Sequence, residues 1–371
     1  MIIAFSFLTN DEENGNCILE IFDKITKSHL EHTFLFISDK PFQEAFVFSK
    51  NVVPVVINYE AKSPMKWLIW HNIKIPKVLK KYKADIFISE RFCSLITKVP
   101  QILIAPDLTY IHQPTYVNKK QKLFYKKFTP RFLKKAKTII AYSEYAKADI
   151  IKQFKINTHK IQVTDSGTYE NCKPINIEER ENIKEKYADG NEYFIYSGII
   201  SPQKNLMNLL KGFSAFKKRQ RSSMQLIIAG KPGKKYKEFI ESLSLYRFNK
   251  EVKLLDNLSP KEIVKIIASA YAMIYPVLYE TTANSLMEAM KCAVPVITSS
   301  TGAIPDICGE AALFFDPENP KDIAEKMMLI FKDEKLRKEL IEKGNILGER
   351  YDWEKSADVL WRNIEKNLIT P

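Results

Sequence analysis

Short apolar runs alternate with longer amphipathic segments along most of the chain. The runs show no polar–apolar alternation, and continuous apolar strands joined by helical crossovers are typical of parallel sheets covered on both faces. They form two series, which predicts two doubly wound, Rossmann-like α/β domains rather than one large sheet. The first series is IIAFSFL, HTFLFIS, NVVPVVI, ADIFIS, QILIAP, TIIAYS and KIQVTD, and the second is YFIYSG, QLIIAG, VKLLD, AMIYPVL and VPVITS.

A polar, turn-rich segment at about residues 169–192 separates the two series. We therefore expect an N-terminal domain over residues 1–170, a C-terminal domain over 171–351 and a final helix over 352–371. Open parallel sheets bind their ligands beyond the carboxyl ends of the strands. The predicted site is therefore a cleft between the two domains, with the candidate residues in loops that follow strands.

The composition narrows the class of protein. No stretch of 18 uninterrupted apolar residues exists, so no membrane span is expected, and the start has no basic leader. The five cysteines are scattered and lack CxxC spacing, which favours reduced thiols in a cytoplasmic protein over disulfides or a metal site.

The net charge of +13 is unusual, and much of it is local. Residues 118–137 hold nine Lys or Arg and no acid, and apolar residues recur there at helical spacing. One interpretation is a helix with a solvated basic face. The other is a surface that contacts anionic lipid head groups at the inner face of a membrane.

The stretch YETTANSLMEAM, residues 279–290, places Glu280 and Glu288 eight residues apart among turn-forming side chains. Ser285 and Glu288 fit a capping box, so we expect a helix to begin near Ser285 and Glu280 to lie in the loop before it. In a structural interpretation Glu288 only closes the cap. In a functional one, the helix start binds a phosphate and the two carboxylates accept hydrogen bonds from hydroxyl groups on either side.

A second candidate anion site lies in YFIYSGIISPQKNLMNLLKGF, residues 193–213. Gly198 follows a strand and permits close backbone approach. Lys204 stands at the entrance of the next helix, where its ammonium would face a diphosphate. The alternative is an ordinary surface lysine. Two such motifs in one domain favour a sugar nucleotide as the ligand.

These motifs resemble those of the family 4 glycosyltransferases, retaining enzymes of the GT-B architecture. Glu280 and Glu288 match the family's E-x7-E pattern, MEAMKCAVPVI resembles LEAMACGxPVI, and GIISPQKNL resembles G-x-x-x-x-x-K-N. GAIPDICGEAALFFDPENP is similar to the family's GxxPEVxGDAAL segment, and PDLTYIHQP and TIIAYSEYAKADI resemble motifs of its N-terminal half. The resemblance covers nearly the whole chain and implies that the C-terminal helix crosses back to the first domain.

The resemblance also implies roles. Glu280 would contact the donor sugar, Glu288 the ribose and Lys204 the diphosphate of a UDP- or GDP-linked sugar, with Asn284, Ser285 and Leu286 cradling the phosphates and Thr301 near the nucleotide. It implies no cofactor and a metal-independent transfer to a glycan or lipid-linked acceptor in cell-envelope or polysaccharide biosynthesis.

The chain departs from the family pattern at several positions. These are Ile199 and Gln203 where an arginine is common, Pro106 where a histidine is common, and Thr281, Thr282, Ala283 and Asn284 after the first acid. Asp107 and His112 are then the polar candidates on the acceptor side.

Other functions stay open at this point. A nucleotide-sugar epimerase with the same two-domain fold would bind the sugar nucleotide but transfer nothing to an acceptor. A hydrolase could use the two glutamates as acid and base, but Lys204 would then have no role. A basic nucleic-acid-binding protein would fit the charge, yet no recognition motif accompanies it. We therefore expect no nucleic-acid partner.

Overall fold

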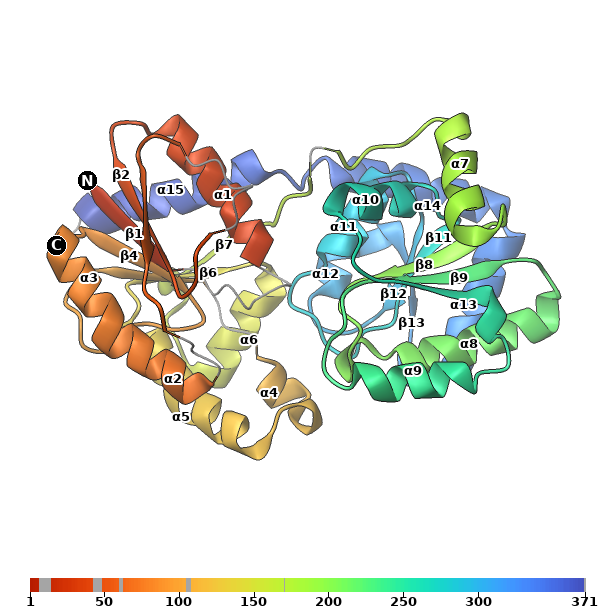
Figure 1. The fold of residues 1–371 in the computed structure, drawn as a ribbon, viewed down its shortest axis with the longest axis horizontal. Coiled ribbons are helices and arrows are strands. Elements are labelled where there is room, and N and C mark those ends of the chain that lie inside the picture. The colour runs from red at the N-terminus through yellow and green to blue at the C-terminus, as the bar shows by residue number, and fades with distance from the viewer. Residues whose placement is uncertain (7–14, 43–48, 60–62, 105–107, 170, 370–371) are drawn as a thin grey trace. The chain divides into compact units, whose positions relative to one another are not determined.

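The computed structural model describes residues 1–6, 15–42, 49–59, 63–104, 108–169 and 171–369. The chain divides into two compact units, which Figure 1 shows in ribbon form. The first unit consists of Met1–Gly167 together with Asp352–Pro371, and the second of Thr168–Tyr351. Asp107, predicted as a site residue on the acceptor side, lies outside the described residues.

The first unit is built on a parallel sheet, in which seven described strands follow the order β3-β2-β1-β4-β5-β6-β7. The order places β4 on the other side of β1 from β2, as in Rossmann folds. The strands are β1 (Ile2–Ser6), β2 (Thr33–Ser38), β3 (Val52–Val56), β4 (Ile86–Glu90), β5 (Gln101–Ile104), β6 (Thr138–Ala141) and β7 (Ile161–Val163).

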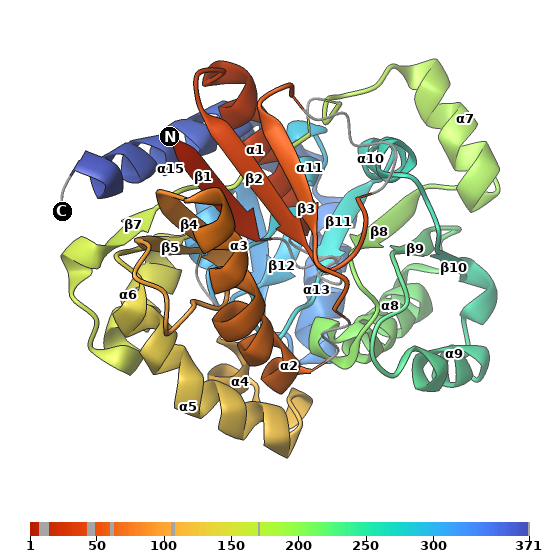
Figure 2. The same ribbon diagram turned by 60° about the vertical axis from the view of Figure 1, so that its left-hand side comes forward.

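Helices cover both faces of this sheet (Figure 2). The basic segment forms a helix as predicted: α5 begins after Asn118, whose side chain accepts the backbone N–H of Gln121, and it continues through an internal Pro130. The helical segments are α1 (Gly15–Ser28), α2 (Pro64–Ile69), the π-helix η1 (Trp70–Lys74), α3 (Ile75–Tyr82), α4 (Thr109–His112), η2 (Pro114–Tyr116), α5 (Lys119–Lys135), α6 (Glu144–Phe154) and η3 (Thr158–Lys160).

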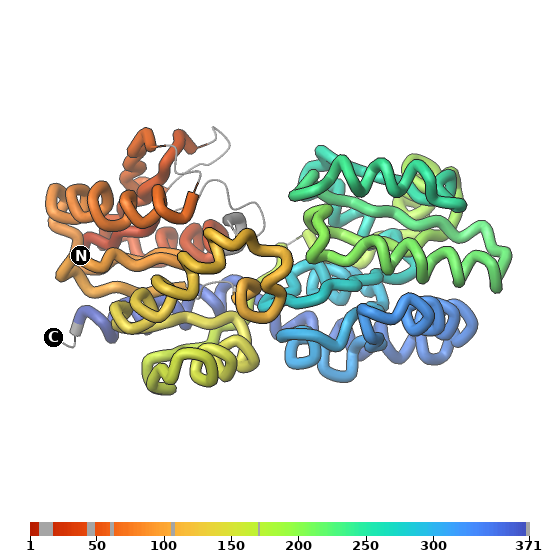
Figure 3. The backbone as a smooth tube through the Cα atoms, turned by 90° about the horizontal axis from the view of Figure 1, so that it is seen from below, coloured from red at the N-terminus to blue at the C-terminus, as the bar shows by residue number. Residues whose placement is uncertain are grey.

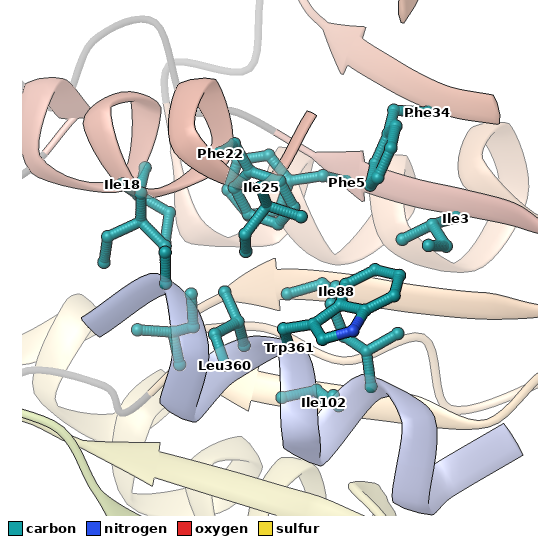
Figure 4. Close-up of a cluster of buried hydrophobic side chains, with 14 of the residues drawn as sticks. Ile3, Phe5, Ile18, Phe22, Ile25, Phe34, Ile88, Ile102, Leu360 and Trp361 are labelled. Carbon is teal, nitrogen blue, oxygen red and sulfur yellow. The ribbon is translucent and has the colours of Figure 1, made fainter. Parts of the chain in front are cut away.

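The last helix, α15 (Trp353–Ile369), packs into the core of the first unit, so both termini belong to that unit (Figure 3). Leu360 and Trp361 of α15 share a hydrophobic cluster with Phe22 of α1 and Ile88 of β4 (Figure 4). Polar contacts fix its register along the sheet, because Asn367 Nδ2 donates to Thr138 Oγ1 over 2.8 Å.

The second unit contains a parallel sheet in which six described strands follow the order β10-β9-β8-β11-β12-β13. This is the same winding, with β11 placed across β8 from β9. The strands are β8 (Tyr193–Ser197), β9 (Gln225–Ala229), β10 (Val252–Leu255), β11 (Ala272–Tyr275), β12 (Val296–Ser299) and β13 (Ala312–Phe315).

The helices of the second unit complete its doubly wound fold. One of them, α10, begins with a capping box between Ser259 and Glu262. The segments are α7 (Ile177–Ala188), η4 (Pro202–Lys204), α8 (Leu206–Gln220), α9 (Tyr236–Ser244), η5 (Asn249–Glu251), α10 (Pro260–Ala268), α11 (Asn284–Lys291), α12 (Ile304–Cys308), η6 (Gly309–Ala311), α13 (Pro320–Lys332) and α14 (Glu334–Gly348).

The predicted fold class is confirmed: each unit is a parallel sheet with helical crossovers. All twelve predicted strands are present. The structure adds β13, whose residues belong to the segment GAIPDICGEAALFFDPENP and were not predicted to form a strand. Across the described part of the chain, no helix combines the length and the apolar character needed to cross a bilayer.

Candidate active site

The candidate site of the second unit lies at the point where its strand order reverses. The strands β8 and β11 are hydrogen-bonded neighbours, and the chain leaves them toward opposite sides of the sheet. Ligands of doubly wound folds bind beyond the carboxyl ends of the two strands at this switch point. Lys204 follows β8 and Glu280 follows β11, so the topology alone brings the two predicted residues to one edge.

Lys204 and Glu280 form an ion pair there. The Lys204 Nζ atom lies 2.8 Å from Glu280 Oε2, and the Tyr275 hydroxyl donates to the same oxygen over 3.1 Å. The two charged side chains are only 10% and 15% exposed. Because water screens such a pair weakly, it holds the ammonium and the carboxylate in fixed positions at the strand ends.

Asn205 holds the Lys204 loop in place. Its backbone is left-handed, with φ 58°, which ends the 3-10 turn η4 and starts α8. Its Nδ2 donates to the carbonyls of Pro276 and Pro317 over 3.0 and 2.7 Å. One amide side chain thus ties the loop after β8 to the loops after β11 and β13.

Gly302 holds the Glu280 loop. It has φ +61°, and a Cβ atom there would lie 2.2 Å from the Glu280 carbonyl oxygen. The Ala303 N–H donates to that same carbonyl over 2.8 Å. The loop after β12 can therefore support Glu280 only because a glycine lets the two backbones approach.

The N-cap residue of the helix α11 lies two residues before Ser285, the predicted N-cap. Ala283 is its N-cap residue, no side chain caps it, and the predicted capping box between Ser285 and Glu288 is wrong. The Leu286 N–H instead donates to the Ala283 carbonyl, which tightens the first turn. Asn284, Ser285 and Leu286 all belong to this first turn. A helix start without a side-chain cap is the arrangement that binds an anion.

Glu288 lies within α11, partly buried. Burial disfavours the charged carboxylate and raises the pKa of Glu288 to about 7. It is therefore a group that changes its charge near neutral pH, unlike an ordinary surface glutamate.

Gly198 and Thr301 have defined backbone roles. Gly198 has φ +148°, and a Cβ atom on Gly230 would lie 1.8 Å from the Gly198 carbonyl oxygen, so the loops after β8 and β9 touch backbone to backbone. The Thr301 hydroxyl donates to the Val277 carbonyl over 3.1 Å. Ile199 lies in the loop between β8 and η4, and Gln203 lies within η4.

In the first unit, His112 ends the short helix α4, and its Nε2 lies 2.6 Å from Asp149 Oδ2. Asp149 is a buried residue of α6, and Gln153 Nε2 donates to its other oxygen over 3.2 Å. The carboxylate therefore fixes the orientation of the imidazole.

Sequence reasoning did not single out several of these residues. Tyr275 and Gly302 contact Glu280, and Asp149 contacts His112. Asp149 belongs to the segment TIIAYSEYAKADI, which resembles a motif of the family's N-terminal half, and this resemblance could have identified it as a site residue. Tyr275 had none, because a tyrosine in an apolar strand is an ordinary core residue.

Comparison with known proteins agrees with this architecture. Residues 178–346 match the family described as glycosyl transferases group 1, and residues 19–168 match glycosyltransferase family 4. The O-antigen chain mannosyltransferase B of Escherichia coli is 24% identical over 279 residues, which are 74% of this chain and 73% of that protein.

Solved structures share the fold. WaaG, a glycosyltransferase involved in lipopolysaccharide biosynthesis, superposes with a TM-score of 0.77 at 14% identity, covering 97% of this chain and 99% of WaaG. Anabaena Alr3699/HepE, solved in complex with UDP and glucose, superposes with a TM-score of 0.74 at 16% identity, covering 99% and 100% of the two chains. Both units of the chain thus match, and it belongs to the family 4 glycosyltransferases of the GT-B architecture.

Proposed function

We propose that this glycosyltransferase moves a hexose from a nucleotide-diphosphate sugar to a glycan or lipid-linked acceptor, with retention of configuration and without a divalent metal. The observation that carries the proposal is the Lys204–Glu280 pair at the switch point of the second unit, next to the uncapped start of α11. A cation, a carboxylate and a helix N-terminus are the groups that a sugar diphosphate requires.

The difficult step is the departure of the nucleoside diphosphate while positive charge develops on the anomeric carbon. Lys204 and the first turn of α11 would stabilise the departing phosphate, and this electrostatic contribution is usually the largest in such a reaction. Charge-assisted hydrogen bonds contribute roughly 1.5–3 kcal/mol each. Glu280 would accept hydrogen bonds from the donor sugar, and Glu288 would accept them from the ribose.

Retention requires attack on the face from which the nucleotide leaves. The departing phosphate oxygen can then accept the proton of the acceptor hydroxyl, so the protein need not supply a strong base. His112, oriented by Asp149, and Asp107 are the groups that we assign to the acceptor side.

The relatives suggest the substrates. The Escherichia coli relative of this chain is named an O-antigen chain mannosyltransferase, and the Anabaena structure contains UDP and glucose. We therefore place this chain in cell-envelope polysaccharide synthesis, with a UDP- or GDP-linked hexose as donor. A cytoplasmic sugar nucleotide and a membrane-linked acceptor would meet at the inner face of the membrane. We propose that the protein contacts this face through residues 118–137.

The test is a thermal-shift panel of nucleoside diphosphates and sugar nucleotides with and without EDTA, followed by mass spectrometry of products. The proposal expects stabilisation by one sugar nucleotide that EDTA does not change, and a glycosylated acceptor. Stabilisation abolished by EDTA would contradict metal independence. Turnover of the donor without any acceptor would indicate an epimerase or a hydrolase instead.

A further inference from the structure

The helix formed by α2, η1 and α3 carries a row of exposed apolar side chains. Met65, Ile69 and Ile73 are 55%, 38% and 50% exposed. In an α-helix each step of four residues advances by about 40° around the axis. The wider turn of the π-helix at Trp70–Lys74 reduces this drift, so the three side chains stay close to one line.

The same row becomes basic toward the end of the helix. Lys77 and Lys81 continue the spacing of four, and both are exposed. The opposite side of the helix is anchored, because Ile75 and Leu79 are buried in the core of the first unit. The row is therefore an outward face whose first half is apolar and whose second half is positively charged.

The neighbouring helix α5 adds charge. The two helices contact each other (Figures 1 and 2), and Trp67 of α2 packs against the cluster that contains Phe124 and Phe132 of α5. Residues 63–83 and 118–137 together hold fifteen Lys or Arg and no Asp or Glu. That exceeds the net charge of +13 for the whole chain, so all other residues together are net negative. The positive charge is concentrated on this one pair of helices.

We propose that the face formed by residues 65–81 and α5 docks on an anionic lipid bilayer, with Met65, Ile69 and Ile73 inserted between the lipids. This goes beyond a basic helix that merely faces lipid head groups, because it assigns the anchoring to aliphatic side chains on a different helix. Aliphatic side chains in water gain free energy from entering the acyl region, and lysines beside them gain from anionic head groups. The two contributions come from neighbouring helices, because α2 and α5 contact each other.

A nucleic acid fits this surface less well. Single strands are bound by stacking of bases on exposed aromatic rings, whereas the exposed large side chains of the row are aliphatic. An apolar row offers nothing to a phosphate backbone. Arg131 is the sole arginine of the two segments, and arginine is the residue that proteins favour for bidentate phosphate recognition.

The test is co-sedimentation of the full chain with phosphatidylcholine vesicles, with and without phosphatidylglycerol. The wild type is expected to bind the mixed vesicles and to release them as salt rises. The triple variant Met65→Ser, Ile69→Ser, Ile73→Ser should bind the mixed vesicles at least about tenfold more weakly. Lys77→Gln and Lys81→Gln should each weaken binding about fivefold.

The control removes three apolar side chains of the second unit that are even more exposed than those of the row. Ile177, Leu245 and Ile346 are 80%, 88% and 75% exposed, and their serine variants should bind vesicles like the wild type. Equal binding by the row variant, equal loss in the control, or binding of oligonucleotides in place of vesicles would each overturn the proposal. Nucleotide binding by the same variants, measured without vesicles, should be unchanged, so a failure here is separable from a failure of the proposed transferase chemistry.

Discussion

The Lys204 ammonium lies 2.8 Å from the Oε2 atom of Glu280, a residue 76 positions further along the chain. The contact exists because β8 and β11 are neighbours at the switch point of the second sheet. In the free protein the ammonium is held by a carboxylate. A bound diphosphate would share that ammonium with Glu280, so the pair keeps the cation oriented before the donor arrives.

Replacing Glu280 with glutamine should separate nucleotide binding from sugar transfer. The variant removes the negative charge beside Lys204, so the affinity for a nucleoside diphosphate should stay the same or rise. Transfer should fall about ten- to hundredfold, because a charged hydrogen bond to the donor sugar is lost. Calorimetry and steady-state turnover measure the two effects. Glu318→Gln, in an exposed loop of the same unit, is the control and should change neither.

Gly302→Ala should destabilise the site through backbone contact. The new Cβ atom would meet the Glu280 carbonyl at 2.2 Å in a left-handed conformation. The left-handed backbone alone costs about 1–2 kcal/mol, and displacement of Glu280 should raise the KM for the donor as well. Gly190→Ala is the matched control, because Gly190 also has a positive φ of 74° but its Cβ would meet only the flexible end of Glu185. A similar loss of donor affinity in both variants would refute the role of Gly302.

Glu288 should make stability depend on pH. Burial raises its pKa from 4.5 to about 7, so between these values the folded protein keeps a proton that the unfolded chain releases. The wild type should therefore lose about 3 kcal/mol of stability as pH rises through this window. Glu288→Gln carries no charge, so its melting temperature relative to the wild type should increase from pH 5 to pH 8. A constant difference across that range would show that Glu288 ionises normally.

His112→Ala should affect the acceptor and not the donor. His112 belongs to the first unit, whereas Lys204 and Glu280 belong to the second. We expect lower acceptor-dependent turnover with unchanged nucleotide affinity. Asp149→Asn should give a smaller loss of the same turnover, since it removes the charge that orients the imidazole. The exposed His159 provides the control variant, His159→Ala. Loss of nucleotide affinity in His112→Ala would argue against this division of roles.

The sequence predicted the strands and the position of Glu280 in its loop because both depend on local patterns. Near-continuous apolar runs identify buried parallel strands, and the turn-forming residues after Glu280 exclude a helix there. The predicted N-cap of α11 is wrong because Ser285 and Glu288 fit a capping box in the sequence, whereas the chain turns helical at Asn284 and needs no cap from Ser285.

The contacts that define the site could not be predicted in the same way. The Lys204–Glu280 pair depends on β11 lying next to β8, and the His112–Asp149 pair joins residues 37 apart on two different helices. Neither relationship has a local signal. The apolar row of Met65, Ile69 and Ile73 can be recognised as a surface feature only from the exposed fractions of these side chains in the structure. In a sequence, the same spacing is typical of a buried helix face.

The most direct measurement compares a nucleoside diphosphate with its monophosphate, by calorimetry, on the wild type and on Lys204→Met. Lys211→Met, on the exposed face of α8, is the control. We predict that the wild type and the control prefer the diphosphate, and that the preference falls about ten- to hundredfold without the Lys204 ammonium. An unchanged preference for the diphosphate in Lys204→Met would contradict the assignment of the phosphate site to Lys204, Glu280 and the start of α11.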